Sequence, residues 1–172
     1  MNRVTISSRE ALSEEGQAVY DEIMGTRGKV DEAFQVLLPA PELLRRIAYL
    51  GSYVRFGSGL TAAVRECIIL ATARHMGSEF EWADHEPQAR AAGVSAETIQ
   101  SIRDGNLPVH ASNPERLVVQ FVYQTMRDQN VTDTCFRSVQ TEFGTVGTAE
   151  IAATIGFYSM LANILTVFNV GR

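Results

Sequence analysis

Apolar side chains recur every three to four residues along most of the chain, which is the spacing of a helix with one buried face. The clearest run, residues 41–56, begins with a proline near its first turn and repeats apolar residues at Leu43, Leu44, Ile47, Leu50 and Val54. No stretch alternates apolar and polar residues over the length of a strand, and no Asn-Gly or Asp-Gly turn separates β-rich runs. The pattern therefore predicts an all-α protein.

Capping residues and glycines divide this pattern into eight helices joined by short loops. Serine and threonine side chains that accept hydrogen bonds at helix N-termini precede several runs, and glycines follow them. The predicted helices cover residues 13–24, 41–56, 61–76, 79–92 and 95–105, a segment that opens at Asn113, and residues 133–143 and 148–170. The third and fourth are expected to be neighbours joined at Gly77. A length of 172 residues fits one domain with its own core.

The last predicted helix is long and apolar enough to raise the question of a membrane span. No charged residue occurs from Ile151 to Val170. However, the segment contains polar residues, three of which (Ser159, Asn163 and Thr166) share one helical face, and basic or aromatic anchors do not flank both ends. We therefore expect a helix buried on nearly all sides, either at the centre of its own domain or by a partner subunit, with one polar stripe that lines an interface or a pocket.

Charge and cysteine content exclude several functions. The chain has 15 Lys+Arg and 20 Asp+Glu, a formal net charge of −5 and no basic run, which argues against nucleic-acid binding. Its two cysteines, Cys67 and Cys135, are too few for a disulfide framework and too far apart in sequence for a CxxC redox pair. The N-terminus has no apolar signal-peptide core, so we expect a cytoplasmic protein.

The residues with most chemical potential lie between positions 65 and 85. Glu81 and His85 are four residues apart, so their side chains meet on one face of a helix. A carboxylate beside an imidazole orients the ring and raises its pKa, which suits proton transfer near neutral pH. If the helices on either side of Gly77 form a hairpin, Glu66 approaches the same place. We therefore expect the three side chains to converge, with His85 within hydrogen-bond reach of a carboxylate.

The motifs in this region resemble the carboxymuconolactone decarboxylase family, which includes the alkylhydroperoxidase D branch. The matching residues are the Arg65-Glu66 pair, the EW-x-x-H core of Glu81, Trp82 and His85, and a Gly-Val-Ser restart at 93–95. The resemblance covers residues 40–170, with 1–40 as an N-terminal extension of one 1–172 domain. It implies an all-α helical bundle, a trimer or hexamer, and no cofactor in the decarboxylase branch.

The departure from the peroxidase branch decides between activities. Members of that branch have a CxxC pair where this chain has Ser78 and Glu81. Thiol peroxidase chemistry needs an attacking thiolate and a resolving thiol, and neither serine nor glutamate can replace them. The resemblance to the decarboxylase branch implies His85, Glu81 and Glu66 as catalytic residues, with His85 as the proton donor.

The expected substrate is a small carboxylated or lactone metabolite. Arg65 and Arg46 are candidate carboxylate ligands, and Trp82 and Ser78 are further substrate-binding candidates. Each has a structural alternative: Ser78 with Glu81 also fits a helix capping box, and Trp82 also suits a core. No metal-binding motif occurs. The alternatives to a lyase are an alkylhydroperoxidase-like antioxidant protein, disfavoured by the missing CxxC, and a non-catalytic oligomeric binding protein. No membrane or nucleic-acid partner is expected.

Overall fold

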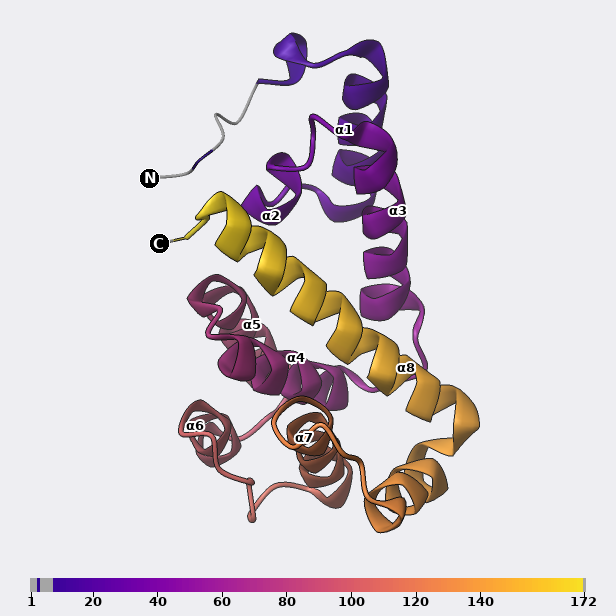
Figure 1. The fold of residues 1–172 in the computed structure, drawn as a ribbon, viewed down its shortest axis with the longest axis vertical. Coiled ribbons are helices and arrows are strands. Elements are labelled where there is room, and N and C mark those ends of the chain that lie inside the picture. Colours follow the sequence, from indigo (N-terminus) through magenta and orange to yellow (C-terminus); the bar gives the residue numbers. More distant parts are fainter. Residues whose placement is uncertain (1–2, 4–7, 172) are drawn as a thin grey trace.

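The computed structural model describes residue 3 and residues 8–171, and the described chain is helical with no strand (Figure 1). This confirms the predicted all-α class. The helices are α1 (Glu14–Arg27), α2 (Glu32–Gln35), α3 (Pro41–Ser52), α4 (Ala62–Met76), α5 (Glu79–Ala91), α6 (Ala96–Arg103), α7 (Asn113–Met126) and α8 (Asp133–Phe168), with a 3-10 turn, η1 (Arg9–Ala11), and a π-helical turn, η2 (Tyr53–Gly57).

Two hydrophobic cores share α4 and α8. One core lies among α4–α7 and the first part of α8, and the other lies among α1–α3 and the C-terminal part of α8. Figure 1 shows the C-terminal part of α8 crossing the molecule diagonally between these two groups of helices. Helix α4 faces both cores, because Ile68 packs into the first and Ile69 into the second, and neither is exposed. A side chain at the boundary between the two cores is therefore shielded from solvent by helices of both cores.

Side-chain caps and glycines set the helix boundaries as predicted. The side chains of Ser13, Thr61, Ser78 and Ser95 each accept a hydrogen bond from a backbone N–H in the first turn that follows. Gly77 ends α4 with a left-handed backbone (φ 62°), which glycine adopts without a steric penalty. Helices α4 and α5 are thus neighbours joined at Gly77, as the sequence predicts.

Helix α8 differs from the prediction in two respects. The two helices predicted at 133–143 and 148–170 are continuous except for one non-helical residue, Gly144 (φ 68°, ψ 179°), where the chain bends. The expected burial on nearly all sides is wrong for the single chain, because Ala152, Ala153 and Gly156 are among the residues exposed on one face. By length and composition α8 could cross a membrane, as many core helices of soluble proteins could, and 44% of its most apolar stretch is buried.

The chain before α4 contains three short elements that the apolar spacing does not predict: the 3-10 turn η1, helix α2 and the π-helical turn η2. Four-residue α2 buries Ala33 and Phe34, and it is too short to show a helical repeat. The predicted helix 41–56 changes to a π-helical turn at Tyr53. Glu150 of α8 fixes this turn, because its buried carboxylate accepts hydrogen bonds from the Tyr53 hydroxyl (2.7 Å) and the Gly59 N–H (3.1 Å).

The region predicted as an N-terminal extension is packed into the fold. Val19 and Ile23 of α1 and Phe34 of α2 belong to the same core as α3 and α8. Gly51 of α3 permits the closest approach in this core, since a Cβ there would lie 2.6 Å from Phe157 Cζ and 2.9 Å from Arg27 Nη2.

We expect Gly51→Ala to lower the free energy of unfolding by about 1–3 kcal/mol, because the added methyl group overpacks the contact between α3 and α8. Urea denaturation at constant protein concentration measures this change. Gly25→Ala is the matched control: Gly25 lies within α1, a Cβ there meets nothing within 4 Å, and the substitution should be neutral or stabilise by up to about 1 kcal/mol. Equal effects of the two substitutions would contradict this account of Gly51.

Candidate functional site

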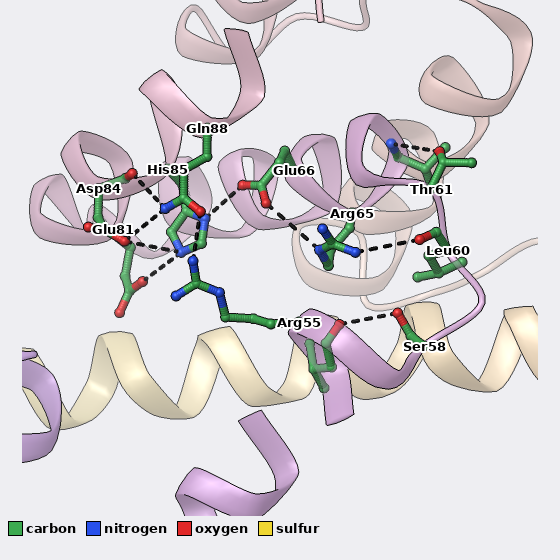
Figure 2. A network of polar contacts seen from close by, with 12 residues as sticks. Arg55, Ser58, Leu60, Thr61, Arg65, Glu66, Glu81, Asp84, His85 and Gln88 are labelled. Atoms are coloured by element: carbon green, nitrogen blue, oxygen red, sulfur yellow. Dashed lines mark hydrogen bonds and ion pairs between the residues drawn. The ribbon is translucent and has the colours of Figure 1, made fainter. Parts of the chain in front are cut away.

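The α4–α5 hairpin brings His85 against Glu66. His85 Nδ1 on α5 lies 2.7 Å from Glu66 Oε2 on α4 (Figure 2), and the two residues are 19 positions apart in the sequence. Both side chains are buried, with 2% of His85 and 3% of Glu66 exposed. In the ionised state a carboxylate only accepts hydrogen bonds, so Glu66 accepts from Nδ1–H and holds the ring in one orientation.

This orientation directs the other ring nitrogen toward two further carboxylates of α5. His85 Nε2 lies 3.7 Å from Glu81 Oε2 and 3.8 Å from Asp84 Oδ2. Tyr158 of α8 packs edge-on against the imidazole, with ring centroids 5.0 Å apart. The predicted convergence of Glu66, Glu81 and His85 is thus confirmed as geometry.

Burial changes the acidity of Glu81. Its side chain is removed from water, which raises its pKa from 4.5 to about 7, although the neighbouring His85 and Arg55 act in the opposite direction. A carboxyl group with this pKa exists in both protonation states near neutral pH. Glu81 can therefore donate or accept a proton beside His85 Nε2.

A small cavity of about 30 Å³ lies at this point, at the boundary between the two cores. Glu81, Asp84 and His85 of α5 form one side, and Tyr158 and Phe157 of α8 form another. Residues from the N-terminal half complete the lining: Arg27, Asp31, Ala33, Phe34 and Arg55. The remaining lining residues, Phe80 and Leu161, are apolar. The cavity thus combines charged groups with aromatic walls, as small-molecule sites do, although its volume is that of about two waters.

Arg55 reaches the cavity from the π-helical turn. Its Nη2 donates to Gln88 Oε1 (2.7 Å), and the Gln88 amide nitrogen donates to Asp84 Oδ2 (3.1 Å). Figure 2 shows the Arg55 guanidinium beside His85 and Glu81, on the side of the ring away from Glu66. π-Helical turns are rare and frequently occur at functional sites.

The structure places two of the four predicted substrate-binding residues away from this cavity on α3 and α4. Arg46 is on the surface of α3, where its Nη2 donates to Glu42 Oε1 (2.6 Å) and 77% of its side chain is exposed. Arg65 points away from the cavity: its Nε lies 3.8 Å from Glu66 Oε1, and its Nη1 donates to the Leu60 carbonyl (3.5 Å). Arg65 thus contacts Glu66 on the side opposite His85, and the carboxylate-binding role expected of both arginines has no geometric support within the chain.

The other two residues have structural roles on α5. The Ser78 hydroxyl accepts from the Glu81 N–H (3.5 Å), which caps the helix, while the Glu81 side chain turns to His85. Trp82 is buried in the core, its Nε1–H donates to Glu86 Oε2 (2.6 Å), and the Arg103 guanidinium covers its ring. Neither residue lines the cavity. Ser78 has the capping role and Trp82 the core position that were their structural alternatives.

Sequence reasoning missed the residues that complete the site from other helices. Arg27, Arg55 and Tyr158 all line the cavity, yet they are separated from His85 by 30 residues or more. The apolar pattern leaves Arg27 outside the predicted helices and places Tyr158 within an apolar helix. Arg55 and Tyr158 are polar-tipped residues within apolar runs, a pattern too common to identify a site, and Arg27 has no such signal.

The structure offers neither a reactive thiol site nor a metal-binding site among the described residues. Cys67 and Cys135 are unpaired and buried, and burial raises the pKa of both thiols, which suppresses the reactive thiolate. Among the described residues, no group of three His, Cys, Asp or Glu side chains is arranged to hold a metal ion.

Comparison with known proteins agrees with this fold. The sequence profile of the carboxymuconolactone decarboxylase family matches residues 41–123. A peroxidase-related protein from Ralstonia eutropha JMP134, with an alkylhydroperoxidase AhpD core, has a TM-score of 0.80 at 18% identity, over 98% of this chain and 90% of that one. A peroxidase-related protein from Silicibacter sp. TM1040 has the same TM-score and coverage at 14% identity. The debrominase Bmp8 has a TM-score of 0.74 at 13% identity, over 96% of this chain and 89% of that one.

A search of curated proteins finds no match. The matched profile covers just under half of the chain, and the solved structures share an alkylhydroperoxidase-like fold; both findings support the resemblance to the carboxymuconolactone decarboxylase and alkylhydroperoxidase D-like superfamily. The residues on which the family resemblance rests, Glu66, Glu81 and His85, form one buried cluster in the structure.

The raised pKa of Glu81 predicts how stability depends on pH. Between about pH 4.5 and 7 the Glu81 carboxyl keeps its proton in the folded protein and loses it in the unfolded chain. The free energy of unfolding is therefore highest, as far as Glu81 is concerned, below this pH range and decreases as the pH rises through it. The loss amounts to at most about 3 kcal/mol. Relative to Glu81→Gln, which cannot ionise, the wild type should become less stable from about pH 5 to 8.

Urea denaturation of both proteins at several pH values measures this difference. Glu79→Gln is the control, because Glu79 is on the same helix but exposed, and its difference from wild type should stay nearly constant over the window. A wild-type and Glu81→Gln pair whose curves remain parallel would contradict an elevated pKa of Glu81.

Proposed function

We propose that the protein is a cofactor-independent enzyme of the decarboxylase type, which acts on a small carboxylated or lactone metabolite by acid–base chemistry. The observation that carries this proposal is the buried contact between His85 Nδ1 and Glu66 Oε2, with Nε2 free to face the cavity and Glu81. A carboxylate that fixes one imidazole nitrogen leaves the other to transfer a proton to a bound molecule. The EW-x-x-H motif supports the decarboxylase branch.

The reaction would proceed without an oxidant or a metal. The bond between the ring carbon and the departing carboxylate breaks, carbon dioxide leaves, and the electron pair delocalises into the conjugated lactone carbonyl. The carbon is then protonated from His85 Nε2, while Glu66 stabilises the imidazolium through Nδ1. Glu81, with a pKa near 7, is placed to return a proton to the ring.

Peroxide reduction by thiols is less well supported. Ser78 and Glu81 occupy the positions of the two thiols, and the Ser78 hydroxyl caps α5. Cys67 is completely buried, so it cannot meet a peroxide and a reductant in the folded state. A lyase activity is therefore the proposal, and antioxidant activity is the alternative.

We also propose a homo-oligomer, a trimer or hexamer by family resemblance. Apolar side chains are exposed in the single chain along α3 and η2: Leu43, Tyr49, Leu50, Tyr53 and Phe56. Exposed apolar groups that cluster on one element mark contact surfaces for a partner, and α8 exposes a further face of small residues.

We expect His85→Gln to reduce turnover of a carboxylated muconolactone by at least about 100-fold while the protein stays folded, because glutamine keeps hydrogen bonds but cannot shuttle a proton. Carbon dioxide release, with deuterium incorporation from heavy water into the product, measures the step. His75→Gln is the matched control, since His75 is exposed on α4 and outside the cavity. Full activity of His85→Gln would remove the proton-donor role.

We expect light scattering to give the mass of a trimer or hexamer at micromolar concentration. Tyr49→Asp should shift this mass toward the monomer, because Tyr49 is 81% exposed and a charge there opposes burial in an interface. Val109→Asp is the control, since Val109 is an exposed apolar residue outside α3 and should not change the mass. A monomeric wild type would end the oligomer proposal.

A further inference from the structure

Among the described residues, no carboxylate lies within ion-pair distance of Arg27, which extends into the boundary between the cores. Within the same part of the chain its buried Nε and Nη2 have no hydrogen-bond partner. Its contacts are aromatic, with the guanidinium carbon 4.8 Å from the centre of the Phe34 ring and 5.9 Å from that of Phe56. Burial lowers the pKa of Arg27 and repulsion from Arg55 adds to this, while Tyr158 and Asp31 act in the opposite direction. The folded chain alone thus leaves its donors unused.

Arg55 brings a second guanidinium to the same cavity. Its one hydrogen bond within the described chain is to the neutral amide of Gln88, at 2.7 Å. The nearby acids are engaged elsewhere: Lys29 Nζ lies 2.7 Å from Asp31 and 3.6 Å from Asp84, and Gln88 also donates to Asp84. Two guanidinium groups therefore face one cavity, and although Asp31, Glu81 and Asp84 also line it, no carboxylate of the described residues forms an ion pair with either guanidinium.

Such an arrangement costs stability in the unliganded protein. Buried donors without partners lose the hydrogen bonds that water supplied, and like charges in a low dielectric repel. An anion between the two groups removes both penalties at once. Arginine is suited to this, because its planar fork binds the two oxygens of a carboxylate with parallel hydrogen bonds. The cavity volume of about 30 Å³ is about twice what one water needs, which is room for a carboxylate but not for a whole planar acid, so the side chains around it must move apart to admit the ring.

We propose that Arg27 and Arg55 form a carboxylate-binding site that anchors a small planar acid, with the rest of that molecule directed at His85 Nε2 and Glu81. This inference rests on the proposed function for what happens next at His85, although anion binding itself does not need it. Phe157 and Tyr158 form the apolar wall beside this position. The arginines then determine which substrates bind, and the α5 residues determine the reaction.

The chemistry further indicates which carboxylate is held. In a decarboxylation the departing group changes from an anion to neutral carbon dioxide, so a cation paired with it stabilises the ground state more than the transition state. A pair of arginines therefore assists only if it binds a carboxylate that stays with the product. The product then keeps the bound carboxylate and competes for the same site.

Calorimetric titration with furoate, a planar five-membered ring with one carboxylate, tests the site at constant ionic strength. The neutral analogue furamide is the ligand control. We expect furoate to bind the wild type at least about tenfold more tightly than furamide, and Arg27→Met and Arg55→Gln each to weaken furoate binding at least about tenfold. Arg46→Gln is the protein control, because Arg46 is an exposed arginine outside the cavity and its loss should leave the affinity unchanged.

Arg27→Met also separates a binding role from a structural one. Methionine fills much of the same space among Phe34, Phe56 and Phe157, so the thermal midpoint should rise or stay the same while furoate binding is lost. Furoate should raise the midpoint of the wild type and not that of the variant. A variant that is destabilised yet still binds furoate would show that Arg27 only packs, and would overturn the proposal, as would equal binding of furoate and furamide.

The two proposals can fail separately. Furoate binding that depends on Arg27 and Arg55, without turnover of any carboxylated lactone, supports the anion site and removes the decarboxylase. Turnover that depends on His85 but not on Arg27 or Arg55 removes the anion site and supports the decarboxylase.

Discussion

The contact between His85 and Glu66 is the interaction on which the arrangement of the site depends. It joins α4 to α5 where both side chains are buried. The low dielectric there strengthens the hydrogen bond between the ring nitrogen and the carboxylate, and it makes either group costly if left unpaired. Removing one partner of such a buried pair leaves the other uncompensated, at a cost of about 3–5 kcal/mol. The pair therefore fixes both the register of the hairpin and the direction of Nε2.

The orientation of the remaining groups follows from this contact. Because Glu66 holds Nδ1, the ring presents Nε2 to Glu81 and Asp84 on its own helix. Asp84 then engages Gln88, and Gln88 holds Arg55, so a chain of polar contacts runs from α4 through α5 to the π-helical turn (Figure 2). Glu150 anchors the other end of that turn to α8. Arg55, Asp84 and His85 thus each have a hydrogen-bond partner that limits their movement.

The fold and the α4–α5 part of the site could be predicted because their signals are local. Apolar spacing and caps define the helices, and the spacing of Glu81 and His85 places both on one face whatever the tertiary structure. Arg27, Arg55 and Tyr158 reach the site only through the packing of α1, η2 and α8, and no spacing within one segment reports that packing. For the same reason Arg46 and Arg65 looked suitable by charge, although one points to solvent and the other to the far side of Glu66.

The position of the cavity between two cores has a consequence for dynamics. Proteins open in cooperative units whose opening free energies differ, and here α1 and α2 belong to one core while α5 belongs to the other. An excursion that releases α1 and α2 would carry Arg27 away and admit solvent, while Glu66 and His85 remain joined within the α4–α5 hairpin. We therefore expect local unfolding of α1 and α2 to admit solvent to the cavity without breaking the contact between Glu66 and His85. Amide hydrogen exchange would then show a lower opening free energy for α1 and α2 than for α4 and α5.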